Sequence, residues 1–111
     1  MGKPGPETRL VAAIRKAVKE RHPQAWVLKV HGSPYQPGGT PDLLLCIEGR
    51  LLSMEVKAPQ QGESRARMLG RVTELQWTRI EEVRAAGGVA GVATSVEEAL
   101  ALVAKLDLTI S

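Results

Sequence analysis

Hydrophobic residues repeat at helical spacing near the start of the chain. Five of them recur at steps of three and four residues: Leu10, Val11, Ile14, Ala17 and Val18. This spacing predicts an amphipathic helix. The helix should follow the Pro4-Gly5-Pro6 stretch and end at His22, because Pro23 disfavours the α conformation in the residue before it.

Four short apolar runs predict strands. They cover residues 26–30, 42–48, 51–57 and 89–94. The second and third runs are joined at Gly49-Arg50, which predicts a tight hairpin. The segment 31–41 is rich in Pro and Gly and is predicted to be a loop, and a polar stretch follows the hairpin at 58–72.

Capping signals predict two further helices. The first begins with a T-x-x-Q box at Thr73 and ends at Gly87-Gly88, and the second begins with an S-x-x-E box at Ser95. The predicted order is α-β-β-β-α-β-α. This order indicates an α/β or α+β fold, with a central mixed sheet flanked by helices.

Three charged residues lie at one end of the apolar hairpin: Asp42, Glu55 and Lys57. Side chains alternate across a strand, so Glu55 and Lys57 share a face. We expect a two-residue turn that pairs Glu48 with Leu51. Asp42 then lies opposite Lys57 and diagonal to Glu55. A loop of odd length would send Asp42 to the other face, so an even-length loop is part of the prediction.

The two acids of the hairpin favour a metal site. Neighbouring carboxylates repel each other unless a cation lies between them. Oxygen ligands without a Cys or His cluster select a hard ion, Mg²⁺ with Mn²⁺ as a substitute. An ammonium such as that of Lys57 can position a water or neutralise charge that develops on phosphorus. These residues therefore predict metal-assisted transfer of a phosphoryl group to water.

The composition fits one globular domain with a mild positive charge. Fifteen Lys and Arg against twelve Asp and Glu give a formal net charge of +3. Basic residues cluster at Arg65, Arg67 and Arg71, which suits either a polyanionic partner or a solvated helix face. We expect a single domain over residues 1–111, with a flexible N-terminus at 1–6 and a C-terminal tail at 107–111.

Aromatic and cysteine residues are scarce. We expect Trp26 and Trp77 to lie in the core rather than to stack on bases, and the single Cys46 to be a small buried residue. The sequence contains no apolar segment of membrane-spanning length and no signal-peptide pattern. A cytoplasmic protein without a membrane partner is the expectation.

The hairpin resembles the signature of PD-(D/E)XK nucleases. Pro41-Asp42 is followed by the Glu55-x-Lys57 pattern, and the fuller series "GGTPDLLLC…EVKAP…ELQ…RAAGG" resembles the VRR-NUC branch of that superfamily. The similarity runs from about Glu7 to Ser95. This branch is known from phage and bacterial proteins and from larger repair nucleases, and it implies a restriction-endonuclease-like fold.

The resemblance also implies roles for individual residues. Asp42, Glu55 and the backbone carbonyl of Val56 would be metal ligands, and Lys57 would orient or activate the attacking water. Gln76, on the following helix, would support the site. Glu7 matches an acid on the first helix that helps to hold the metal, and its spacing from Leu10, Ile14 and Val18 places it on their inward face.

The implied activity is Mg²⁺- or Mn²⁺-dependent hydrolysis of DNA. Such proteins often act as homodimers on branched substrates such as four-way (Holliday) junctions. Candidate DNA contacts are Arg65, Arg67, Arg71 and the loop residue Tyr35, because arginine suits phosphate oxygens.

Other interpretations of these residues remain open. Asp42 after Pro41 is typical of turns, Gln76 completes a capping box, and Glu7 suits the positive end of a helix dipole. The whole chain could also be a partner-dependent DNA-binding module with little activity of its own. A structural α/β domain with solvated hairpin charges is a third interpretation.

Overall fold

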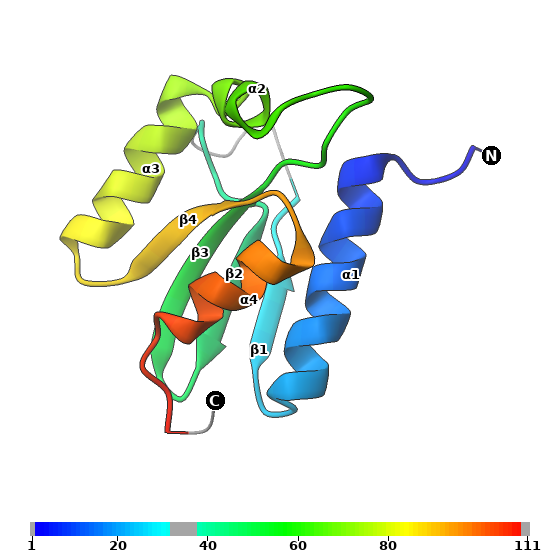
Figure 1. The fold of residues 1–111 in the computed structure, drawn as a ribbon. Coiled ribbons are helices and arrows are strands. Elements are labelled where there is room, and N and C mark those ends of the chain that lie inside the picture. Colours follow the sequence, from blue (N-terminus) through cyan, green and yellow to red (C-terminus); the bar gives the residue numbers. More distant parts are fainter. Residues whose placement is uncertain (1, 32–37, 110–111) are drawn as a thin grey trace.

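The computed structural model describes residues 2–31 and 38–109. A four-stranded sheet with helices on both sides forms the centre of the molecule (Figure 1). In chain order the elements are α1 (Pro6–Arg21), β1 (Trp26–Lys29), β2 (Leu43–Ile47), β3 (Arg50–Val56), α2 (Arg65–Gly70), α3 (Glu74–Ala85), β4 (Val89–Ala93) and α4 (Val96–Ala104). None of these helices, within the described ranges, is long and apolar enough to cross a membrane.

The sheet is mixed, as the sequence predicts. Its strand order is β1-β2-β3-β4, with antiparallel pairing along the first three strands and parallel pairing between β3 and β4. The predicted fold class is therefore confirmed. The one added element is α2, a six-residue helix within the segment 58–72, where Ser64 Oγ accepts a hydrogen bond from the backbone N–H of Arg67.

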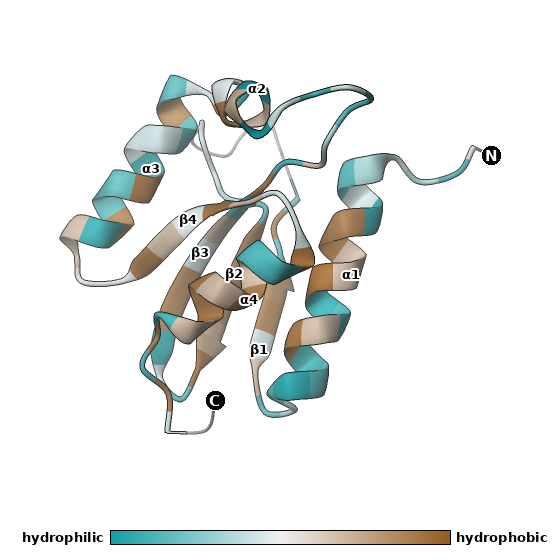
Figure 2. Cartoon of the chain, in the orientation of Figure 1, coloured by the Kyte–Doolittle hydropathy of each residue, from teal (hydrophilic) through white to brown (hydrophobic). Residues whose placement is uncertain are grey.

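The core lies between one face of the sheet and the helices α1 and α4. From α1, Val11, Ile14 and Val18 are buried, as the helical spacing predicts. Leu102 and Val103 of α4 pack into the same cluster as the inward side chains of β2 and β3. Figure 2 shows the apolar strands and the apolar segments of both helices that meet there.

The other face of the sheet is only partly covered, because α3 packs against β4 and β3. Trp26 lies on this open face and is 51% exposed, so its expected core position is wrong. Cys46 pairs with Trp26 across the sheet and is partly exposed rather than buried. Leu28 and Leu51 are also exposed. Burial alternates regularly along β1 and β2, but no helix covers the outward side chains of these two strands among the described residues.

The hairpin turn lies one residue earlier than predicted. Ile47 pairs with Arg50, so Glu48 and Gly49 form the turn instead of Gly49 and Arg50. Both turn residues have positive φ, 52° at Glu48 and 78° at Gly49, as a type I′ turn requires. This turn matches the right-handed twist of the strands. The register differs from the prediction by two residues, so the even-length loop is confirmed and every side chain keeps its predicted face.

Replacing Gly49 with Ala should destabilise the protein by about 1–2 kcal/mol, because a side chain opposes the left-handed backbone. Nothing lies within 4 Å of an added Cβ at this position, so conformation alone sets the effect. Gly70→Ala is the matched control, because Gly70 also has open space around it but lies in α2 without positive φ. Urea denaturation of both variants should show a loss for Gly49→Ala and none for Gly70→Ala.

Candidate active site

The carboxylate of Asp42 is fixed across the hairpin. Asp42 directly precedes β2, and its Oδ2 accepts a hydrogen bond from the backbone N–H of Val56 at 2.7 Å. Leu43 pairs with Met54, so the same register continued by one residue sets Asp42 opposite Glu55. The expected pairing of Asp42 with Lys57 is wrong. The closer approach of Asp42 to Glu55 follows from the shifted turn.

Glu55 is the buried centre of the site. It is 3% exposed, although it points to the sheet face that α1 and α4 leave open. Its Oε1 accepts a hydrogen bond from Gln76 Nε2 at 3.0 Å and lies 3.9 Å from Lys57 Nζ. The structure therefore brings together four side chains, from the residue before β2, the end of β3, the residue after β3 and the first turn of α3: Asp42, Glu55, Lys57 and Gln76.

Gln76 has two structural tasks at once. Its Oε1 accepts a hydrogen bond from the backbone N–H of Thr73, which completes the predicted capping box. Its Nε2 is left to donate to Glu55. The cap fixes the amide orientation, so the first turn of α3 presents a donor to the carboxylate.

Gly39 contributes to the site in a way that the sequence analysis missed. Its φ is 79°, and an added Cβ would lie 2.5 Å from the backbone oxygen of Leu75 and 3.0 Å from the N of Gln76. Glycine therefore lets the segment before Asp42 pass directly against the first turn of α3. The Gly-Gly pair before Pro41-Asp42 was the available signal.

The pKa of Glu55 is raised from 4.5 to about 9. Burial is the largest cause, followed by a hydrogen bond with Asp42 and the negative charge of Asp42. Lys57 acts in the opposite direction, and the charge of Glu7 adds to the increase. Without a cation, Glu55 therefore keeps its proton at neutral pH. A bound cation would favour the ionised form.

The donors present fit a hard cation. Within the described ranges, no three side chains of His, Cys, Asp or Glu gather closely enough to hold a metal by themselves. A metal would depend on the carboxylates of Asp42 and Glu55, with backbone carbonyl oxygen and water completing its shell. Such an all-oxygen set, with two acids that repel each other in its absence, suits Mg²⁺ or Mn²⁺.

Glu7 lies near these carboxylates but is not buried. Its side chain is 46% exposed, and its Oε1 lies 3.3 Å from Nη1 of Arg71. Its effect on the pKa of Glu55 indicates proximity to the site. The prediction that Glu7 points inward is therefore confirmed only in part.

The candidate DNA contacts differ from one another. Arg65 and Arg71 are held in ion pairs, with Glu98 and Glu63 respectively. Arg67 is exposed, and its guanidinium has no ion pair or hydrogen bond within the described part of the chain. Tyr35 lies outside the described residues.

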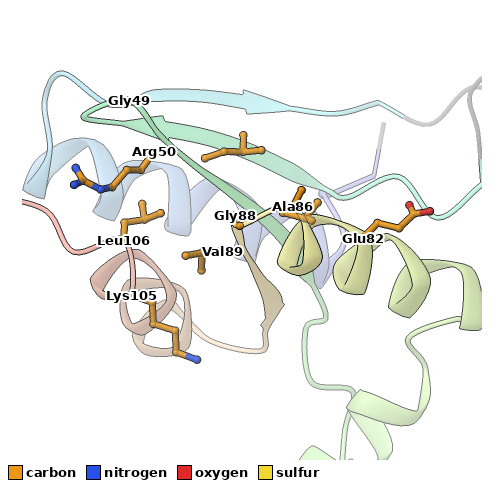
Figure 3. A pocket seen from close by; sticks show the side chains of 11 residues that line it. Gly49, Arg50, Glu82, Ala86, Gly88, Val89, Lys105 and Leu106 are labelled. Atoms are coloured by element: carbon orange, nitrogen blue, oxygen red, sulfur yellow. The ribbon is translucent and has the colours of Figure 1, made fainter.

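A cavity of about 590 Å³ lies elsewhere, at the hairpin end of β3. It is lined by residues including Leu51, Val83 and Val89. Arg50, Glu82 and Lys105 point their charged ends in different directions (Figure 3). The charged groups of this cavity do not converge, whereas those at the other end of β3 do.

A comparison with known proteins relates the fold to that of a solved structure. No family model matches the sequence, and no curated protein matches it. A solved structure described as a VRR_NUC domain superposes with a TM-score of 0.60 over 91% of this chain and 97% of that chain. The chain has the fold of that domain. The sequence identity is 24%, and at this level the likeness establishes the fold.

Glu55 should make the stability of the metal-free protein depend on pH. Its pKa is about 9 in the folded protein against 4.5 ordinarily, so the folded state holds an extra proton between these values. The free energy of unfolding should therefore fall as the pH rises from about 5 to about 8, by at most about 1.4 kcal/mol per pH unit from this group.

Urea denaturation in EDTA across this pH range measures the slope. Glu55→Gln keeps the shape of the side chain without its ionisation and should flatten the slope. Equal slopes in both proteins would show that Glu55 is not the group that titrates.

Proposed function

We propose that this chain is a metal-dependent endonuclease that hydrolyses phosphodiester bonds of DNA. The observation that carries the proposal is the buried Glu55 beside Asp42, with Lys57 3.9 Å away and Gln76 hydrogen-bonded to it. Two acids and an ammonium at one point of a sheet fit phosphoryl transfer to water. The likeness to a VRR_NUC domain supports the same class of activity.

Asp42, Glu55 and the backbone carbonyl of Val56 are the groups that would hold the metal, with Glu7 as an outer acid. Mg²⁺, or Mn²⁺ in its place, would supply charge stabilisation for phosphate oxygens when bound. Within the chain, the Val56 N–H holds the Asp42 carboxylate, and Gln76 holds that of Glu55. These fixed positions limit reorganisation during the reaction.

Lys57 is the residue that acts on the reacting groups. Its ammonium orients the water and stabilises negative charge that develops on phosphorus. The water oxygen bonds to phosphorus as the bond to the 3′ oxygen breaks, which leaves a 5′-phosphate and a 3′-hydroxyl. The proton lost by water is balanced by the proton gained at the 3′ oxygen. Lys57 is held in the site by its backbone N–H, which donates to the carbonyl of Ala93 on β4 at 3.1 Å.

Removing any of the three charged groups should abolish cleavage. We expect Asp42→Asn, Glu55→Gln and Lys57→Met each to lower the cleavage rate of labelled DNA with Mg²⁺ by about 100-fold or more. Lys16→Met is the matched control, because Lys16 is exposed on α1, where it pairs with Glu20. EDTA should stop the wild-type reaction.

The same assay separates the alternatives. Near-wild-type cutting by all three variants would contradict the proposed active site. Binding of DNA that weakens with salt, without turnover, would instead favour the partner-dependent DNA-binding module. A rise in melting temperature with Mn²⁺, lost in Glu55→Gln, would still establish a metal site, whereas the structural-domain alternative expects no such rise.

We further propose that the enzyme is a homodimer that cuts branched DNA. The open face of the sheet supports this proposal, because Trp26, Leu28 and Leu51 are each exposed by 44% or more on it. Within β1, β2 and the first half of β3, the described side chains on this face carry no charge. An uncharged apolar patch suits protein contact better than phosphate contact. Two sites related by two-fold symmetry suit a junction with paired arms.

Trp26→Glu should convert the dimer to a monomer, because it places a charge in the apolar face. Light scattering after size exclusion measures the mass across a range of protein concentrations. Leu75→Glu is the control, since Leu75 is 52% exposed but lies on α3. A wild-type protein that is monomeric at all concentrations would remove the dimer from the proposal.

A further inference from the structure

The guanidinium of Arg71 joins three separate segments of the chain. Its Nε and Nη2 donate to the two carboxylate oxygens of Glu63 at 2.7 and 2.8 Å. Nη2 also donates to the carbonyl of Ala58 at 2.7 Å, and Nη1 donates to Glu7 at 3.3 Å. One side chain therefore ties the end of the 58–72 segment to its beginning and to the first turn of α1.

The contact with Ala58 fixes the backbone directly after Lys57. Ala58 is buried, and its carbonyl is held by Arg71. On the other side, the backbone N–H of Lys57 is held by Ala93. The main chain around Lys57 is thus anchored once by β4 and once by Arg71. β3 ends at Val56, and the hydrogen bond from Lys57 to Ala93 extends its pairing with β4 by one residue.

The contact with Glu7 fixes a second group beside the site. Glu7 lies in the first turn of α1, where the N-cap residue Gly5 has no side chain to hold the turn. Among the described residues, Arg71 is the one cation in contact with the Glu7 carboxylate. The position of the Glu7 carboxylate therefore depends on Arg71.

The ion pairs of Arg71 also argue against a direct DNA contact. The Glu63 side chain is largely buried and occupies the Nε–Nη2 edge of the guanidinium in a bidentate pair. A phosphate would have to displace this pair. Lysine would replace only part of the arrangement, because an ammonium lacks the planar fork that serves Glu63, Ala58 and Glu7 together.

We infer that Arg71 is a positioning residue of the active site, which acts through the backbone at Lys57-Ala58 and through Glu7. The inference rests on the proposed nuclease activity. Glu63 is part of the same arrangement, since its carboxylate holds the guanidinium of Arg71 in place. Arg65 is outside it, because Arg65 pairs with Glu98 at the start of α4.

The experiment compares Arg71→Ala, Arg71→Lys and Glu63→Ala with the control Arg84→Ala. Arg84, in the last turn of α3, also donates to a carboxylate and a backbone carbonyl, those of Glu81 and Ala90. We expect Arg71→Ala and Glu63→Ala to lower kcat about 10- to 100-fold, the effect of a misplaced catalytic group. Arg71→Lys should recover part of the rate, and Arg84→Ala should stay near wild type. DNA affinity in EDTA, and its dependence on salt, should be unchanged in all four variants.

Glu63→Ala separates positioning from DNA binding. It removes a negative charge, so if Arg71 contacted phosphate this variant would bind DNA as well as wild type or better and keep its kcat. Weaker binding in EDTA by Arg71→Ala, with a smaller salt slope, would likewise identify a phosphate contact and overturn the inference.

A readout without activity keeps the two proposals distinct. Amide hydrogen exchange of peptides that cover residues 55–62 and 6–12 should become faster in Arg71→Ala, with the sheet protection of β2 unchanged. Unchanged exchange in both peptides would overturn the positioning role, whether or not the protein cuts DNA. If the wild-type protein does not cleave DNA but exchange is faster in Arg71→Ala, the result would count against the proposed function and not against the positioning role.

Discussion

The burial of Glu55 next to Asp42 is the constraint on which the rest of the site depends. A carboxyl with 3% exposure beside a second acid is costly to ionise, and the raised pKa expresses that cost. Gln76 and Lys57 reduce the cost without removing it. A cation would remove it, so binding of a cation and loss of a proton from Glu55 are linked. The fold thus holds Asp42 and Glu55 in an arrangement that favours binding of a cation between them.

This arrangement is set at the opposite end of the hairpin. The Glu48-Gly49 turn determines which residues of β2 and β3 face each other, and the ladder carries that register to Asp42 and Glu55. A shift by one residue would place the two acids on opposite faces, whereas a shift by two keeps them together. The arrangement of the candidate site therefore depends on whether the turn has an even or odd number of residues, although the turn lies at the other end of the hairpin.

The even length of the turn explains why the sequence predicted the shared face of the site residues correctly. Alternation along the strands placed Asp42, Glu55 and Lys57 on one face even though the turn was predicted one residue too late. The capping signal located Gln76 in the first turn of α3, within reach of Glu55. Exposure of Trp26 could not be predicted, because it depends on which strands α3 leaves uncovered. Local patterns determine faces, but long-range packing determines burial.

The arginines of the 58–72 segment show that charge along the sequence, like burial, cannot be interpreted without long-range packing. Counted along the sequence, Arg65, Arg67 and Arg71 form a basic cluster that suits DNA. In the fold, Glu98 and Glu63 engage two of them. The Arg65–Glu98 pair fastens the segment to α4, and a hydrogen bond from Arg71 to the carbonyl of Ala58 joins the end of the segment to its beginning. A cation that already has a carboxylate partner contributes little to counterion release on DNA. The basic composition of this segment is therefore weaker support for DNA binding than it is when the arginines are counted along the sequence.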